Sequence, residues 1–260
     1  MVLIPPSSHV LITGASSGLG AALAIRYAAP GRRLSLFGRD RVRLDEVAEA
    51  CNHRGSVADR YVCDVCDAGA IAHFLKAADD QAPVDLLFAN AGIGGASSLT
   101  ANTEDPLAQA HDLMETNVLG MLNTIVPLLP NFMARRHGHI VLIGSIAGLV
   151  GLPQSPAYCA SKAAVHVYGE GLRRMLGPFG VGVTVVCPGF VDTPMSASLP
   201  TPRPFLWSAD RAAAHIARAV AQRRRRLVFP WQLRWAASLA AILPSAVVDR
   251  LMPTTEWNAP

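Results

Sequence analysis

The stretch His9–Gly20, HVLITGASSGLG, decides the fold of this chain. Its first part, His9–Thr13, has the apolar character of a buried β-strand, and its second part, Thr13–Gly20, is rich in glycine and opens a helix. Such glycines permit a tight turn, let the backbone approach a pyrophosphate and let the helix pack closely on the strand, while the helix start offers free N–H groups to the anion. A glycine-rich turn without a ligand is the alternative. We expect a dinucleotide site lined by Gly14, Ser16, Ser17, Gly18, Leu19 and Gly20.

The rest of the chain alternates short apolar runs with amphipathic stretches. Further strands are expected at Arg33–Phe37, Arg60–Cys63, Val84–Ala89, His139–Gly144 and Gly182–Val186. Helices are expected at Gly18–Ala29, Arg41–His53, Ala68–Ala78, Leu107–Leu129, Ala157–Leu176 and Asp210–Arg224. This alternation predicts an α/β fold, a Rossmann-type doubly wound parallel sheet with helices on both faces. No repeat or linker divides the chain, so residues 1–260 are expected to form a single dinucleotide-binding catalytic domain.

Composition argues for a globular protein without a nucleic-acid partner. Hydrophobic residues make up 51% of the chain, charged residues make up 16%, and the net charge is only +4. The one dense basic run, Arg223–Arg226, has no interleaved aromatic residues, so we expect a solvated helix face. Met1–His9 lacks the pattern of a secretion signal, and the five cysteines are an odd number, which favours free thiols in a reducing cytoplasm. Cys63 and Cys66 form a lone CxxC, for which ordinary packing is favoured over a metal site.

Polar residues follow several of the predicted strands. Asn90-Ala91-Gly92 follows the fourth strand and Pro188-Gly189 follows the sixth, while Tyr158 and Lys162 lie four residues apart on one face of a helix. Together with the TGxxxGxG loop, these motifs resemble the short-chain dehydrogenase/reductase family over Val10 to about Met195. Since a parallel sheet binds its ligands at the carboxyl ends of its strands, we expect these residues to converge there.

The resemblance implies roles for individual residues. Tyr158 is the proton donor, Lys162 its activating neighbour, Ser145 the serine that orients the substrate, and Asn117 the fourth catalytic residue. Cofactor contacts are implied for Asp64 and Val65 at the adenine, for Asn90, Ala91 and Gly92 beside the adenosine, for Lys162 at the nicotinamide ribose next to Tyr158, and for Pro188, Gly189, Val191 and Thr193 near the carboxamide. Asp64 could equally form a turn at its strand end.

The chemistry expected of this set is the interconversion of a carbonyl and a secondary alcohol. A free tyrosine has a pKa near 10, and a nearby ammonium should lower it toward the neutral range. Lys162 supplies that ammonium, Ser145 stabilises charge on the substrate oxygen, and Asn117 holds a water that links Lys162 to solvent. The hydride belongs to the nicotinamide.

The choice between NAD and NADP is expected at the end of the second strand. Gly38 occupies the position where NAD-specific relatives carry an aspartate, and Arg39 can pair with a 2′-phosphate, so NADP is favoured. Asp40 complicates this expectation because it could neutralise Arg39.

Two segments outside the motifs carry further expectations. Residues 194–207, with Met195, Leu199, Phe205 and Trp207, read either as a substrate lid over an apolar pocket or as a loop packed on its own domain. Residues 227–260 read as an apolar and aromatic extension that covers the pocket, forms a dimer contact or touches a membrane surface peripherally.

The function expected from the sequence is therefore an NADP(H)-dependent oxidoreductase for a hydrophobic small molecule. We expect a cytoplasmic homodimer or homotetramer. A non-catalytic nucleotide-sensing module is one alternative, and it does not explain the joint presence of Tyr158, Lys162, Ser145 and Asn117. An extended-type sugar epimerase is the other, and the glycine spacing and the short C-terminal region disfavour it. The substrate itself and the physiological direction stay open.

Overall fold

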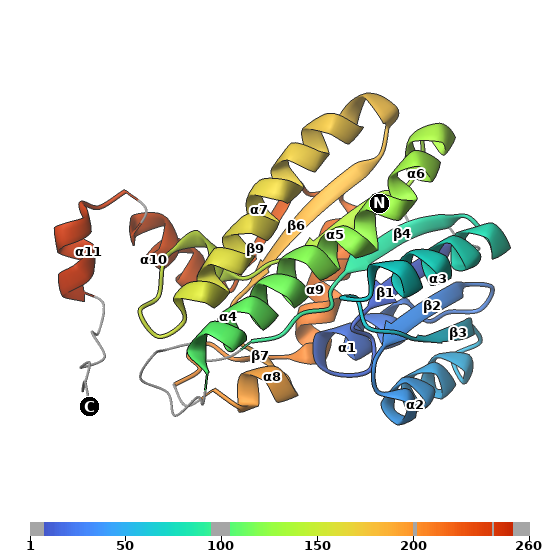
Figure 1. Ribbon diagram of the computed structural model, residues 1–260, viewed down its shortest axis with the longest axis horizontal. Helices are drawn as coiled ribbons and strands as arrows, with labels where there is room; N and C mark the ends of the chain where they lie inside the picture. The colour runs from blue at the N-terminus through green and yellow to red at the C-terminus, as the bar shows by residue number, and fades with distance from the viewer. Residues whose placement is uncertain (1–7, 95–104, 200–201, 241, 252–260) are drawn as a thin grey trace.

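A seven-stranded parallel sheet forms the centre of the molecule (Figure 1). The computed structural model describes residues 8–94, 105–199, 202–240 and 242–251. The strand order is β3-β2-β1-β4-β5-β6-β9, which reverses direction between β1 and β4. The predicted doubly wound α/β fold is confirmed, and the crevice at this reversal is where such sheets bind their ligands. The strands are β1 (His9–Thr13), β2 (Arg33–Gly38), β3 (Val57–Val62), β4 (Val84–Ala89), β5 (His139–Ile143), β6 (Gly182–Pro188) and β9 (Arg226–Phe229).

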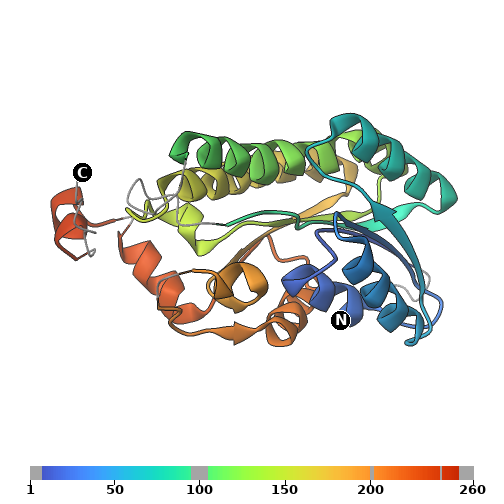
Figure 2. The same ribbon diagram turned by 60° about the horizontal axis from the view of Figure 1, so that its bottom comes forward.

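Helices cover both faces of the sheet and enclose two hydrophobic cores (Figure 2). Successive residues of a strand point to opposite faces, so Val10 and Ile12 enter one core and Leu11 enters the other. The first core lies under α1 (Gly18–Tyr27), α2 (Arg41–Asn52) and α9 (Ala209–Ala221). The second lies under α3 (Ala68–Gln81), α7 (Pro156–Leu176) and the long helical run before β5. Burial on both faces explains why most strands are continuous apolar runs.

The long helical run is interrupted by a π-helical turn. It passes through α4 (Pro106–Met114), η1 (Glu115–Leu119), α5 (Gly120–Ile125), η2 (Val126–Leu128) and α6 (Leu129–Arg135), where η1 is the π-helical part. Its two prolines stand at the starts of η2 and α6, where a missing N–H costs little, so the run continues beyond the predicted end at Leu129. Of the described residues, only this run has the length and composition to cross a membrane, and it packs on the sheet as a core helix.

The C-terminal part differs most from the sequence expectation. α9 ends at Ala221, and Arg223 has a left-handed backbone with φ of 49°, so Arg223–Arg226 does not form the expected helix face, although its side chains are exposed. Arg226 begins β9, a strand that was not predicted and whose Leu227 and Phe229 are buried in the first core. The expected extension therefore begins after Phe229, with α10 (Trp231–Ala240) and α11 (Ser245–Leu251).

Several short elements lie in the connections. They are η3 (Ile146–Leu149), η4 (Gly177–Phe179), α8 (Pro194–Ala197) and the two-stranded pair β7 (Val191–Asp192) with β8 (Trp207–Ser208). Of these, η4 lies before the start of β6, and the others lie beyond the carboxyl ends of the strands. β3 also starts three residues earlier than predicted. It is an edge strand with alternating exposure, which weakens the apolar signal on which the prediction depended.

Candidate active site

A cavity of about 1160 Å³ opens along the carboxyl ends of the strands. Every residue predicted to bind the cofactor lines it, and so does Ser145. Asn117 is buried and does not line it. Since one small-molecule site usually occupies roughly 300–1,000 Å³, a cavity of this size has room for a dinucleotide together with part of a substrate.

The glycine-rich loop is built so closely that side chains at its glycines would clash. Gly14 and Gly18 have positive φ angles of 65° and 54°. A Cβ at Gly20 would lie 2.0 Å from the carbonyl oxygen of Gly14. Ser17 is the N-cap of α1, and its side chain makes no capping hydrogen bond. The first N–H groups of α1 therefore keep the bonding capacity that a pyrophosphate requires.

Asn90 ties β4 to this loop. Its side-chain amide donates to the carbonyl oxygens of Thr13 at 2.9 Å and Gly14 at 3.2 Å. The Thr13 hydroxyl accepts from the backbone N–H groups of Asn90 at 3.1 Å and Ala91 at 3.2 Å. These bonds join the ends of β1 and β4, where the strand order reverses. They fix the position of the glycine-rich loop relative to β4.

The residues after β2 adopt an arrangement that the sequence did not predict. The Asp40 side chain accepts from the backbone N–H of Arg43 as the N-cap of α2 and pairs with the guanidinium of Arg43 at 3.2 Å. Arg39 pairs instead with Asp64 at 3.3 Å; the Arg39 side chain is largely exposed, and that of Asp64 is partly buried. Asp40 therefore does not neutralise Arg39. Arg43 also lines the cavity and was missed, because its position within a helix gave no signal.

Asp64 is held in its ionised form. Partial burial acts to raise its pKa, but the backbone N–H of Cys66 and the Arg39 guanidinium outweigh this and hold the pKa of Asp64 below its usual value. The carboxylate is therefore an acceptor at neutral pH, as an adenine amino group would require.

Ser145, Tyr158 and Lys162 converge on one wall of the cavity. Ser145 follows β5 and is the N-cap of η3, where its hydroxyl accepts from the backbone N–H of Ala147 at 3.1 Å. Tyr158 and Lys162 lie one turn apart on α7, and the Lys162 ammonium is 5.7 Å from the centre of the Tyr158 ring. A side-chain hydrogen bond links Tyr158 to Ser145. Three groups from two elements thus meet at one place.

Desolvation dominates the ionisation of this pair. Burial lowers the pKa of Lys162 to about 8. Burial also raises the pKa of Tyr158, and the hydrogen bond from Ser145 opposes this only in part. The expectation that Lys162 lowers the tyrosine pKa is therefore not met by the protein alone, because the ammonium is turned toward the carbonyl oxygen of Ile143, at 3.4 Å. At neutral pH the phenol is protonated.

Asn117 sits behind the cavity wall, in the π-helical turn. Its side-chain oxygen accepts from the N–H of Ile93 at 2.9 Å, and its amide nitrogen donates to the carbonyl of Ile93 and the hydroxyl of Ser161, both at 3.0 Å. A Cβ added to Gly92 would lie 2.8 Å from the Asn117 oxygen and 3.3 Å from the Lys162 nitrogen. Gly92 thus leaves a narrow gap between the amide and the ammonium.

The residues after β6 approach the glycine-rich loop from the opposite side. A Cβ on Gly18 would lie 3.0 Å from the methyl group of Thr193. The Thr193 hydroxyl accepts from the N–H of Ser196 in a capping box that begins α8, and it donates to the carbonyl of Val191 at 3.3 Å. A nicotinamide carboxamide at this place would therefore compete for the Thr193 hydroxyl with the backbone groups of Ser196 and Val191.

The segment 194–207 divides between the cavity and the core. Met195 and Leu199 line the cavity, and Met195 lies against Gly94. Trp207 instead stacks on Phe229 in the first core, with a centroid distance of 4.9 Å, and Phe205 is half exposed. The opposite wall contains Val150, Leu152 and Leu233, which the sequence did not single out. Leu233 belongs to α10, within the segment expected to cover the pocket.

Within the ranges that the structure describes, no group of three His, Cys, Asp or Glu side chains is arranged to hold a metal ion. Cys66 contacts the Thr116 hydroxyl at 3.6 Å, and Cys63 is packed in the second core.

Comparison with known proteins gives consistent matches over most of the chain. The family model described as short chain dehydrogenase matches residues 8–204. An uncharacterized oxidoreductase of Myxococcus xanthus is 35% identical over 241 residues, which cover 92% of this chain and 94% of that protein. A short-chain dehydrogenase from Sphingobium yanoikuyae, solved in complex with NADPH, is similar in structure, with a TM-score of 0.78 and 26% sequence identity. The match covers 97% of this chain and 98% of the Sphingobium chain. One from Burkholderia phymatum, in complex with NAD, has a TM-score of 0.80 and 25% identity, with 98% of both chains covered.

Burial of Lys162 predicts that this residue reduces stability. Below pH 8 the ammonium is charged in both the folded and the unfolded chain, so its desolvation cost is fully present. Lys162→Met should therefore raise the free energy of unfolding at pH 7 by about 1–3 kcal/mol. As the pH rises from 8 toward 10.5, the folded protein loses this proton before the unfolded chain does, so the wild type gains stability and the difference shrinks.

Denaturant unfolding of both proteins at several pH values measures this difference. Lys76→Met, at an exposed position on α3, is the control and should change little. A less stable Lys162→Met protein at pH 7 would show that the ammonium makes a net stabilising contribution.

Proposed function

This chain belongs to the short-chain dehydrogenase family and is an oxidoreductase that acts on CH–OH groups with a nicotinamide cofactor, and from this premise we propose that it interconverts a hydrophobic ketone or aldehyde and its alcohol with NADP(H). The observation that carries the proposal is that Ser145, Tyr158 and Lys162 meet in the same cavity as the glycine-rich loop.

The residues present fit a dinucleotide. The loop Gly14–Gly20 offers backbone N–H groups without side chains in the way, and Asp64 offers an ionised acceptor beside Val65. Lys162 lies deep enough to donate to ribose hydroxyls, while Val191 and Thr193 line the same cavity, with Thr193 next to Gly18 of the loop. When bound, the nicotinamide supplies or accepts the hydride.

In the direction of reduction, Tyr158 donates its proton to the substrate oxygen. Its pKa is raised by burial, so at neutral pH the phenol carries the proton to be given. Ser145 donates a hydrogen bond to the same oxygen and stabilises the negative charge that develops there. Lys162 stabilises the phenolate that remains on Tyr158. Asn117 lies across the gap at Gly92 and holds a water through which a proton from solvent reaches Lys162.

NADP is proposed as the preferred nucleotide. Gly38 carries no carboxylate at the end of β2, and Arg39 and Arg43 line the cavity beside it, while the Asp40 carboxylate caps α2. Two guanidinium groups beside an adenosine site favour a 2′-phosphate. The Sphingobium enzyme was solved with NADPH and the Burkholderia enzyme with NAD, so nucleotide binding by both supports the cofactor class.

The substrate is proposed to be apolar. The cavity that contains Ser145 and Tyr158 is lined by Val150, Leu152, Met195, Leu199 and Leu233, with Gln154 and Ser155 as polar neighbours in the same lining. We propose that residues 194–207 act as a lid through Met195 and Leu199, whereas Trp207 anchors the end of this segment in the core. A cytoplasmic location remains our expectation for the enzyme.

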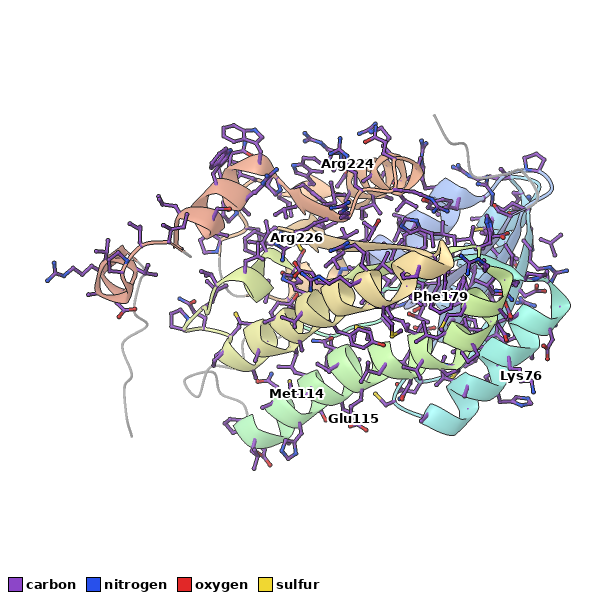
Figure 3. All side chains as sticks on the ribbon, turned by 90° about the horizontal axis from the view of Figure 1, so that it is seen from above. Lys76, Met114, Glu115, Phe179, Arg224 and Arg226 are labelled. Atoms are coloured by element: carbon purple, nitrogen blue, oxygen red, sulfur yellow. The ribbon has the colours of Figure 1, made fainter. Side chains whose placement is uncertain are left out.

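A homo-oligomer is proposed through the outer face of α4, α5 and α7. Exposed apolar side chains occur on these elements and on the turns between them: Leu119 ends η1, Val126 begins η2 and Val167 lies on α7. Figure 3 labels Met114 and Glu115 on the same long helical run. The helices α4 and α7 lie side by side, so their outer surfaces form one continuous face.

Tyr158→Phe should lower turnover by about 10²- to 10⁴-fold, because it removes the proton donor. NADPH affinity should stay within a few-fold, since the ring is retained. Turnover of NADPH with a panel of apolar ketones measures the first effect, and titration of NADPH fluorescence measures the second. Tyr168→Phe, ten residues further along α7, is the matched control. Unchanged turnover in Tyr158→Phe would overturn the assignment.

Arg39→Ala should weaken NADPH binding by about 10- to 100-fold, because a charge-assisted contact to the 2′-phosphate is lost. NADH binding should change little. Arg41→Ala, at an exposed position on α2 outside the cavity, serves as the control. Equal losses for both nucleotides would refute the role of Arg39.

Val167→Asp should convert the oligomer to monomers, because Val167 is 73% exposed on the proposed contact face and a carboxylate there would be buried. Sedimentation velocity measures the mass. Val42→Asp, at a position 68% exposed on α2, is the control. If Val167→Asp still forms the oligomer, the contact between subunits lies on another face of the protein.

A further inference from the structure

The helix α10 presents two different faces. Leu233 lines the large cavity and packs against Gly189, and Ala237 is buried. Trp231, Trp235 and Leu239 follow one another at intervals of four residues, so they share the opposite face. Trp231 is 67% exposed and Trp235 is 68% exposed. The side of the helix that faces away from the protein is thus the more aromatic one.

Such a face is unusual for a surface bathed only by water. Each tryptophan side chain offers roughly 150–250 Å² of surface that gains from burial. Ile242, just beyond the helix, is 82% exposed and extends the apolar stripe. Contiguous exposed patches of this kind mark a surface that binds something.

The surroundings of this stripe are basic. Between residues 222 and 251 the sequence has six arginines and a single carboxylate, Asp249. Figure 3 marks Arg224 and Arg226 in the segment that leads into α10. Arg226 and Arg234 also line a second cavity of about 320 Å³ against the helix, and Arg226 has a distant ion pair with Glu170, at 3.6 Å. The stripe and its rim therefore combine tryptophan, aliphatic residues and positive charge.

We propose that α10 and its arginine rim dock this protein on an anionic lipid bilayer. Tryptophan is the residue enriched at the interface between lipid and water, and each basic residue near an anionic surface contributes about 1 kcal/mol of attraction. The stripe Trp231–Trp235–Leu239 enters the interface, and the exposed Arg234, next to Trp235 on the same helix, faces the lipid phosphates.

A second copy of this chain fits the same surface poorly. In a two-fold contact the patch meets itself, which would bring the arginines of one copy against those of the other. The proposed oligomer face on α4, α5 and α7 lies on different elements. The charge of the patch thus selects the bilayer as the occupant.

Docking would bring the cavity close to the membrane. Because Leu233 lines the cavity from the inner face of α10, a bilayer against the outer face lies one helix thickness away from the substrate wall. Resting on the proposed function, this supplies the enzyme with apolar substrates that partition into lipid. The docking itself does not depend on turnover.

The test is sedimentation of the full-length protein with vesicles. Wild-type protein should bind vesicles of phosphatidylcholine mixed with phosphatidylserine, bind vesicles of phosphatidylcholine alone weakly, and dissociate in high salt. The double variant Trp231→Ala/Trp235→Ala should bind about tenfold less tightly or worse. Arg234→Glu should also weaken binding, whereas Arg41→Glu on α2 should not.

Thermal unfolding and NADPH titration check that the variants are folded, because the altered side chains are exposed and Leu233 is kept. Equal binding by the tryptophan variant and the wild type would overturn the proposal, as would no preference for phosphatidylserine. Unchanged vesicle binding together with a loss of oligomer mass in the tryptophan variant would assign the stripe to a second copy instead. Turnover of water-soluble ketones is measured separately, so failure to bind vesicles and failure of the proposed chemistry can be told apart.

Discussion

The hydrogen bonds between Asn90 and the loop after β1 are the constraint on which the site depends. At the reversal, β1 and β4 are paired side by side, and the crevice forms beyond their carboxyl ends, where strand pairing no longer fixes the position of the loops. Here the Asn90 amide holds the carbonyl oxygens of Thr13 and Gly14, and the Thr13 hydroxyl holds two N–H groups in return. The glycine-rich loop is therefore set against β4, and the walls that carry Ser145 and Thr193 are placed relative to it.

Burial at the catalytic pair sets function against stability. Lys162 is almost completely buried, and the described contacts give its ammonium only a long hydrogen bond to Ile143. Burial lowers the pKa of Lys162 to about 8, so the ammonium is still charged at neutral pH, and burial keeps Tyr158 beside it as the protonated phenol. The folded protein therefore carries a desolvation cost at neutral pH on the same side chain that the proposed chemistry uses.

The sequence predicts the parts of this structure that depend on local pattern. The glycine spacing at Gly14, Gly18 and Gly20 and the apolar runs of the central strands lead to the fold and to the cavity lining. What it misses depends on contacts between distant segments. The pairing of Arg39 with Asp64 joins the ends of two strands, and β9 lies at the edge of the sheet behind a run of arginines that reads as helix. Leu233 reaches the cavity only because β9 returns the chain there. Desolvation at Tyr158 is likewise a property of the assembled site.

The π turn at Glu115–Leu119 has a consequence for how this helix can vary. A π turn contains one residue more than an α turn, so it behaves as a single-residue insertion in an otherwise regular helix. A chain lacking that extra residue would keep both flanking helices on the sheet, yet it would carry the amide of Asn117 away from the backbone of Ile93. The length of the helix, and not only the identity of the asparagine, is thus part of the information that specifies the site. Relatives that differ by one residue in this segment would share the fold and lose the bridge between Ile93 and Ser161.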